Sequence, residues 1–198
     1  IKAILEERRF LDIKNIRVGD LAITVTFSDE KEIQLLPAIR SGDGYKISTE
    51  NGKEWSRIIK PDAFAKRLTE LNNSCGMKLI PVIKLFKGIN SDFPEDLRIS
   101  GYHSESLAIE IFKSYPDSLP RTPKFMIKYF FEKARDAIKN HIRDSTKQSI
   151  HVDDYLGEEN NKIRLRLSNA YDTVFRRMRY ADEAEDESEW MNILGSGI

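Results

Sequence analysis

The sequence predicts an α+β fold, in which a short β part is followed by a mostly helical part. Apolar residues alternate with threonine over residues 21–27, which is the period of a β-strand. From Pro61 onward, apolar residues repeat at the three- and four-residue spacing of helices. Strands that precede a run of helices are typical of α+β proteins, and no internal repeat or low-complexity linker divides the chain.

The β part is expected to begin after the end of a helix. Ile1, Ile4 and Leu5 share one helical face, which predicts that helix end at the start of the chain. Residues 21–27 and 32–36 then predict two strands, which are separated by a short polar turn. We expect these strands to pair as an antiparallel hairpin.

A connector with two turn clusters, at residues 41–44 and 51–52, is predicted after the hairpin. Trp55 follows these turns, and an aromatic residue in such a place is expected to pin the connector onto a core. The expected parts of the chain are a β part at residues 1–40, a connector at 41–60 and a helical part at 61–198.

Five helices are predicted in the helical part. Pro61 suits a first helical position, and Thr122 followed by Pro123 reads as an N-cap and a first position. Pro81 is tolerated only in a first turn, so the second helix is expected to begin near Ile80. The predicted helices span about residues 61–74, 77–90, 101–115, 123–142 and 158–181, and an irregular stretch covers 144–157.

Composition excludes several classes of protein. Apolar residues make up 40% of the 198 residues, which is enough for a core and argues against a disordered chain. The 32 basic and 32 acidic residues balance, which disfavours a whole-surface polyanion binder but leaves a local basic cleft open. The single cysteine, Cys75, excludes a disulfide scaffold and a cysteine-rich zinc module, and it favours a reducing compartment. No apolar run reaches the ~20 residues of a membrane span, and no P-loop, dinucleotide-binding or nucleophile-elbow motif is present.

The second strand offers a first candidate site. Gln34 alternates with Ile33 and Leu35, so its side chain can face a cleft while theirs face a core. A carboxylate at this position would be a good metal ligand, whereas a neutral amide oxygen binds Mg²⁺ less well. Glu32 lies on the same strand face. The alternative is an ordinary surface glutamine.

A second candidate site combines two helices. Lys84 and Lys87 are three residues apart in the second predicted helix and share a face. Ser100 and Gly101 open the third helix, where a hydroxyl and free N–H groups favour an anion or a phosphate. Tyr102 follows, and its ring is suited to stacking on a base. The alternative is a solvated lysine face beside a routine serine N-cap.

The irregular stretch contains His151 and Asp153, which invite a metal or acid–base interpretation. No third ligand follows at a regular spacing, so a structural loop is the favoured interpretation. The residues expected to pack are Ile150, Val152, Tyr155 and Leu156.

The last predicted helix is strongly basic. Such a helix can line a nucleotide or nucleic-acid groove, or its charges can simply balance the acidic segment 182–189 that follows. The basic residues are Lys162, Arg164, Arg166, Arg176, Arg177 and Arg179.

Several segments, taken in order, resemble the cGAS/DncV-like nucleotidyltransferases (CD-NTases) of bacterial anti-phage defence. Residues 27–39 look like the third catalytic strand of that family, and residues 144–157 resemble a loop of its SMODS-type branch. The resemblance covers about residues 20–180. Further similar segments are residues 42–45, Trp55-Ser56 followed by Pro61, residues 85–87 and residues 100–105.

The resemblance implies that the β part is the end of a nucleotidyltransferase palm sheet and that the helical part closes a nucleotide cleft. Two Mg²⁺ (or Mn²⁺) ions in such enzymes activate a ribose hydroxyl and stabilise the leaving pyrophosphate. By position, Gln34 falls where a third metal-binding carboxylate stands, and Glu32 is a weak substitute for it. Lys87 and Ser100, or the Gly101 backbone, fall where the donor triphosphate is held. Tyr102 falls where an aromatic ring stacks on a base.

The expected activity is therefore synthesis of cyclic di- or trinucleotides from NTPs in CBASS signalling, in the bacterial cytoplasm and without a membrane partner. CBASS regulatory or effector proteins are expected partners, and nucleic-acid binding is left open. The remaining metal ligands are expected upstream of residue 1, so the chain alone is expected to be inactive. Two alternatives are a catalytically dead module that binds nucleotide or RNA, which Gln34 motivates, and a helical protein-interaction domain.

Overall fold

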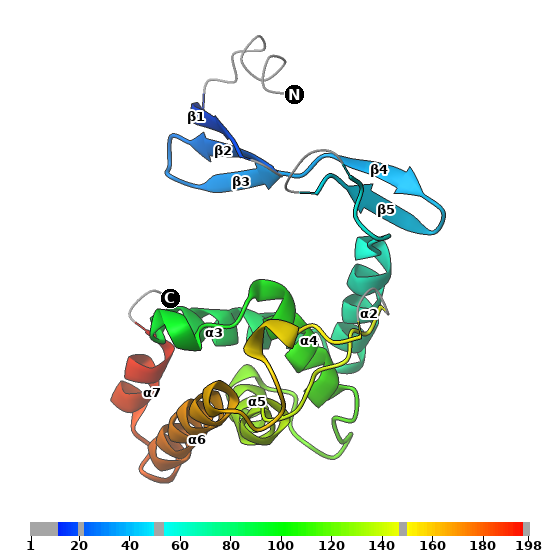
Figure 1. Ribbon diagram of the computed structural model, residues 1–198. Helices are drawn as coiled ribbons and strands as arrows, with labels where there is room; N and C mark the ends of the chain where they lie inside the picture. The colour runs from blue at the N-terminus through cyan, green and yellow to red at the C-terminus, as the bar shows by residue number, and fades with distance from the viewer. Residues whose placement is uncertain (1–11, 20–21, 50–53, 147–149, 196–198) are drawn as a thin grey trace. The chain divides into compact units, whose positions relative to one another are not determined.

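The computed structural model describes residues 12–19, 22–49, 54–146 and 150–195 (Figure 1). The chain divides into two compact units, Ile1–Asp62 and Ala63–Ile198. Strands occupy the first unit and helices the second, which confirms the predicted α+β class. The helix end predicted at the start of the chain lies outside the described residues.

A three-stranded antiparallel sheet opens the first unit. The predicted hairpin is confirmed, because β2 and β3 pair Thr24 with Gln34 and Thr26 with Glu32. Paired residues share a face of a sheet, so Gln34 and Glu32 lie together on the threonine face. The strands, in the order β1-β2-β3, are β1 (Ile13–Val18), β2 (Ile23–Phe27) and β3 (Glu32–Leu35).

A second hairpin, of β4 (Ala38–Ser41) and β5 (Gly44–Ile47), spans the end of the predicted β part and the start of the predicted connector. The predicted turn cluster closes it, with Gly42 at a φ of 58°. Gly44 allows a close approach of the chain, because a Cβ there would lie 2.3 Å from the Ile59 carbonyl oxygen. The expectation that Trp55 pins the connector onto a core is wrong: its side chain is exposed.

The described residues of the helical unit contain the five predicted helices and one more. The predicted N-cap is confirmed, since Thr122 accepts a hydrogen bond from the Phe125 backbone N–H. Pro81 lies in the first turn of its helix, as predicted. The short last helix begins inside the segment 182–189, which the sequence marks only as acidic, and extends beyond it. The helices are α2 (Pro61–Ser74), α3 (Leu79–Asp92), α4 (Gly101–Phe112), α5 (Pro123–Ala137), α6 (Lys162–Glu183) and α7 (Glu187–Leu194), with 3₁₀ turns at Glu95–Leu97 and Asp154–Leu156.

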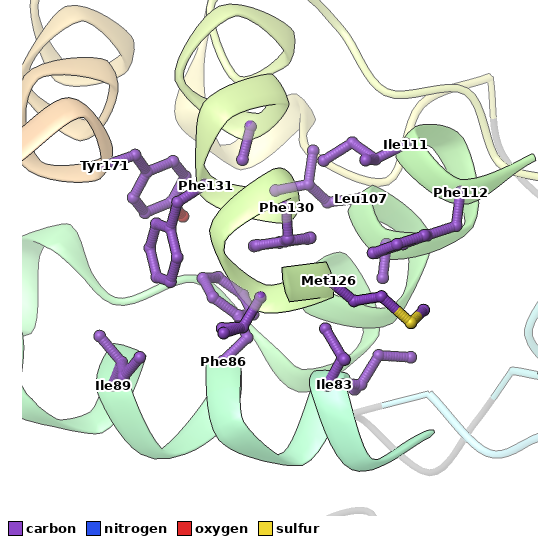
Figure 2. Close-up of a cluster of buried hydrophobic side chains, with 14 of the residues drawn as sticks. Ile83, Phe86, Ile89, Leu107, Ile111, Phe112, Met126, Phe130, Phe131 and Tyr171 are labelled. Carbon is purple, nitrogen blue, oxygen red and sulfur yellow. The ribbon is translucent and has the colours of Figure 1, made fainter. Parts of the chain in front are cut away.

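Aromatic side chains from four helices form the centre of this unit (Figure 2). Phe86 of α3 contacts Phe130 of α5 with ring centroids 4.5 Å apart, and Tyr171 of α6 with centroids 5.8 Å apart. Phe112 of α4 also stacks on Phe130. The core therefore fixes α3, α4, α5 and α6 relative to one another. Within the described ranges, no helix combines the length and apolar character needed to cross a bilayer.

Candidate functional site

Lys87 lies beside the first turn of α4. Its Nζ is 2.5 Å from Glu105 Oε1, and it is 3.8 Å from the point that a Cβ on Gly101 would occupy. Packing of α3 against α4 thus brings Lys87, Ser100 and Gly101 into one group, as the sequence predicts. Lys84 is exposed one turn earlier and has no hydrogen bond or ion pair with another described residue.

The start of α4 presents backbone donors. Ser100 is the N-cap, and its Oγ accepts from the His103 N–H at 3.2 Å. No described residue accepts a hydrogen bond from the N–H of Gly101 or Tyr102, the first two positions of the helix. Two N–H groups at the positive end of a helix, next to the Lys87 ammonium, make a set of donors suited to a phosphate.

The Tyr102 side chain is held by one aromatic contact and one hydrogen bond. It contacts the Phe64 ring with centroids 4.8 Å apart, and its hydroxyl donates to Asp144 Oδ1 at 3.0 Å. Burial, opposed by a hydrogen bond from Thr146 and aided by Asp144, raises the pKa of Tyr102 to about 12, so the hydroxyl stays a donor. Because 38% of the residue is exposed, the ring keeps area for stacking.

Tyr155 connects the loop between α5 and α6 to the start of α4. Its hydroxyl accepts from the Ser100 N–H at 3.2 Å and lies 2.8 Å from His103 Nδ1. The sequence predicts Tyr155 as a packing residue, but the residue is 56% exposed and acts through its hydroxyl. Ile150 is 78% exposed, so its predicted packing is also wrong. Val152 and Leu156 do pack against the core.

His103 is wholly buried under this contact, and its Nε2 has no partner among the described residues. Burial lowers the pKa of His103 to about 4; Asp153 opposes this shift and Arg164 adds to it. The imidazole is therefore neutral near pH 7, with Nδ1 free to accept from the Tyr155 hydroxyl. Periodicity in α4 could have placed His103 on the buried face, since it lies four residues before Leu107.

We expect His103 to make the folded state less stable in mild acid. The unfolded chain, with an ordinary histidine pKa of 6.5, binds a proton before the folded chain does. Stability from His103 is thus complete above pH 6.5 and declines as the pH falls toward 4. Between pH 6 and pH 5 the loss should be about 1 kcal/mol. Urea unfolding of wild type and His103→Gln at both pH values measures this, and an equal loss in both proteins would refute the assignment.

A buried ion pair anchors the same loop. Arg164 Nη1 lies 2.7 Å from Asp153 Oδ2, and both side chains are fully buried. Asp153 Oδ1 also accepts from the Ile142 N–H at 3.0 Å. Arg164 donates to the carbonyl groups of Ile138, Asn140 and Gly157. These bonds turn the chain after α5, which explains why this helix ends at Ala137 and not at the predicted residue 142.

The structure distinguishes between the two interpretations of the basic helix. Arg164 is a buried structural residue and cannot line a groove. Asp153 forms an ion pair with Arg164 and is not a metal ligand. The other arginines of α6 pair with acids, which supports the alternative of a charge-balanced, solvated helix. These pairs are Arg166–Asp96, Arg176–Asp172, Arg177–Glu189 and Arg179–Glu183.

Gln34 and Glu32 are exposed on β3, in the first unit. Glu32 Oε1 accepts from Thr26 Oγ1 at 3.1 Å, which confirms the shared face. Within the described ranges, no group of three metal-ligating side chains gathers around this pair. One carboxylate and one amide supply too few ligands for the two-ion chemistry expected from the sequence, so these residues by themselves do not fit that metal site.

Solved structures of DncV share this fold. The Escherichia coli DncV 3'-deoxy GTP bound form matches with a TM-score of 0.71 and 11% identity, covering 96% of this chain and 52% of that chain. Vibrio cholerae DncV cyclic AMP-GMP synthase in complex with the linear intermediate 5' pppA(3',5')pG also gives 0.71 and 11%, covering 98% and 55%. The GTP bound form of Vibrio cholerae DncV gives 0.71 and 13%, covering 98% and 52%.

The resemblance stated from the sequence is thus confirmed as a likeness of fold. The chain spans about half the length of these solved chains. No family model and no curated protein matches it.

Proposed function

We propose that this chain is part of a nucleotidyltransferase that makes cyclic di- or trinucleotide second messengers from NTPs, and that its helical unit holds the triphosphate of a substrate. The observation that carries the proposal is the group of donors formed by Lys87 and the first turn of α4. The likeness of fold supports it, since the similar DncV structures include a GTP bound form and a complex with a linear dinucleotide intermediate.

In this proposal, the Lys87 ammonium and the N–H groups of Gly101 and Tyr102 bind phosphate oxygens. Glu105 positions Lys87 beside them, and Ser100 caps the helix so that the two N–H groups stay directed outward. The exposed part of the Tyr102 ring stacks on a base. Lys84 adds positive charge one turn away on α3.

We also propose that this activity serves anti-phage signalling through CBASS, with CBASS regulatory or effector proteins as partners. The proposed location is the bacterial cytoplasm. In the complete protein, bound Mg²⁺ or Mn²⁺ would have to take carboxylate ligands in addition to Glu32.

The direct test is product formation by the complete protein that contains this chain. It is incubated with Mg²⁺ and labelled ATP, GTP, CTP and UTP, and phosphatase-resistant products are separated. A resistant product supports the proposal, and mass spectrometry then gives its ring size. NTP binding without any product would favour the second candidate, a nucleotide-binding module that no longer catalyses.

Gln34 is the observation that favours this second candidate, because an amide stands exposed where the resemblance expects a carboxylate. The two candidates predict different results for Gln34→Glu in the complete protein. If the chain belongs to an active enzyme, the wild type already forms product and the carboxylate is not needed. If the site has decayed, product appears only in Gln34→Glu. Gln34→Asn is the matched control, since it keeps the amide and should gain nothing in either case.

A further inference from the structure

The loop between α5 and α6 brings two histidines and a carboxylate together. The rings of His141 and His151 stack with centroids 4.2 Å apart and planes 15° apart. Asp154 Oδ1 lies 3.2 Å from His151 Nδ1 and 3.8 Å from His141 Nδ1. One ligand atom from each of the three residues thus lies within 4.8 Å of the others.

Two of these three separations are near those around a tetrahedral metal ion. With bonds of about 2.0–2.1 Å, two ligand atoms of tetrahedral Zn²⁺ lie about 3.3 Å apart. The distances of 3.2 and 3.8 Å from Asp154 Oδ1 are near that value. The two imidazoles are stacked with planes 15° apart, so both rings have to turn out of this stack before their nitrogens face one ion. Two imidazoles and one carboxylate are also ligands that Zn²⁺ takes readily.

The site is reachable and open. The side chains of His141 and His151 are 18% and 28% exposed, and that of Asp154 is 67% exposed. An ion can therefore enter from solvent and keep water as a fourth ligand. The site is also built on a fixed backbone, because Arg143 and His151 form an antiparallel bridge and the His141 N–H donates to Glu159 Oε1.

The charged groups around the cluster do not repel a cation. Arg164 Nη2 lies 3.1 Å from His141 Nδ1 and donates to it in the structure. An ion bound at that nitrogen would displace this one hydrogen bond, while Arg164 keeps its bonds to Asp153 and to three carbonyl groups. The carboxylates of Asp153 and Asp154 together outweigh the one guanidinium, so a dication is not opposed by net positive charge.

We propose that His141, His151 and Asp154 form a binding site for one Zn²⁺ ion that closes the loop between α5 and α6. The site is separate from the phosphate-binding group and does not depend on the proposed function. Ion binding would order the loop up to Tyr155, the residue after Asp154, whose hydroxyl contacts Ser100 and His103.

The test is Zn²⁺ titration of the complete protein, prepared without a polyhistidine tag, by isothermal calorimetry. We expect one saturable site, with binding at least tenfold weaker in His151→Gln and in Asp154→Asn. Glu158→Gln, which changes an exposed carboxylate of the same loop outside the cluster, should bind like the wild type.

Thermal unfolding supplies a second measurement. Zn²⁺ should raise the melting temperature of the wild type and of Glu158→Gln but not that of the two ligand variants. Circular dichroism confirms that each variant is folded before titration. The absence of saturable binding in the wild type, or equal affinity in the wild type and both ligand variants, would overturn the proposal.

Discussion

Replacing Lys87 by alanine in the complete protein should weaken NTP binding roughly 10- to 100-fold. A hydrogen bond to a charged group contributes about 1.5–3 kcal/mol, and the variant removes the ammonium that lies beside the start of α4. The fold should persist, because Lys87 is only half-buried and its Glu105 partner is accessible to water. Calorimetric titration with each NTP measures the loss.

Lys113→Ala is the matched control for this prediction. Lys113 is also ion-paired, to Glu110 at 2.6 Å, but it directly follows α4 at the end of the helix opposite to Lys87. The control should bind NTPs like the wild type. Equal affinities in the wild type and Lys87→Ala would remove Lys87 from the proposed site.

Replacing Arg164 by alanine should lower the free energy of unfolding by about 3–5 kcal/mol. The change leaves the Asp153 carboxylate buried without its ion partner, which is the costly way to break a buried pair. It also removes the donor for the carbonyl groups of Ile138, Asn140 and Gly157. Urea unfolding at neutral pH gives the difference.

Arg166→Ala provides the comparison on the same helix. Arg166 pairs with Asp96 at 2.5 Å, but both side chains are about half exposed, so the loss should be at most about 1 kcal/mol. Similar losses in the two variants would contradict the structural role assigned to Arg164.

The helices could be predicted because their signals are local. Proline and threonine at helix starts, together with apolar residues at helical spacing, need no distant partner to act. β1 lacks such a signal: its register with β2 shifts between Ile13 and Asn15, and this irregularity breaks the period-two pattern. The hairpin of β4 and β5 has only four residues in each strand, too few to show a clear apolar alternation.

The candidate site was predictable only in part, for the same reason. Helical spacing placed Lys87 on one helix and Ser100 at the start of the next, and core packing then joined them. The contact between Tyr155 and His103 spans 52 residues, which no local pattern reveals. Arg164 did leave a signal, because it shares the buried face of α6 with Leu167 and Tyr171. Both interpretations of the basic helix counted Arg164 by its charge and not by its helix face, so they wrongly treated it as a surface residue.

The central proposal is that the helical unit binds a nucleoside triphosphate. The most direct measurement compares the affinity of the complete protein for GTP and ATP with its affinity for guanosine and adenosine. We expect at least one triphosphate to bind tenfold or more tightly than its nucleoside, because the phosphates meet Lys87 and the N–H groups of α4. Equal affinities, or no binding of any triphosphate, would contradict the proposal.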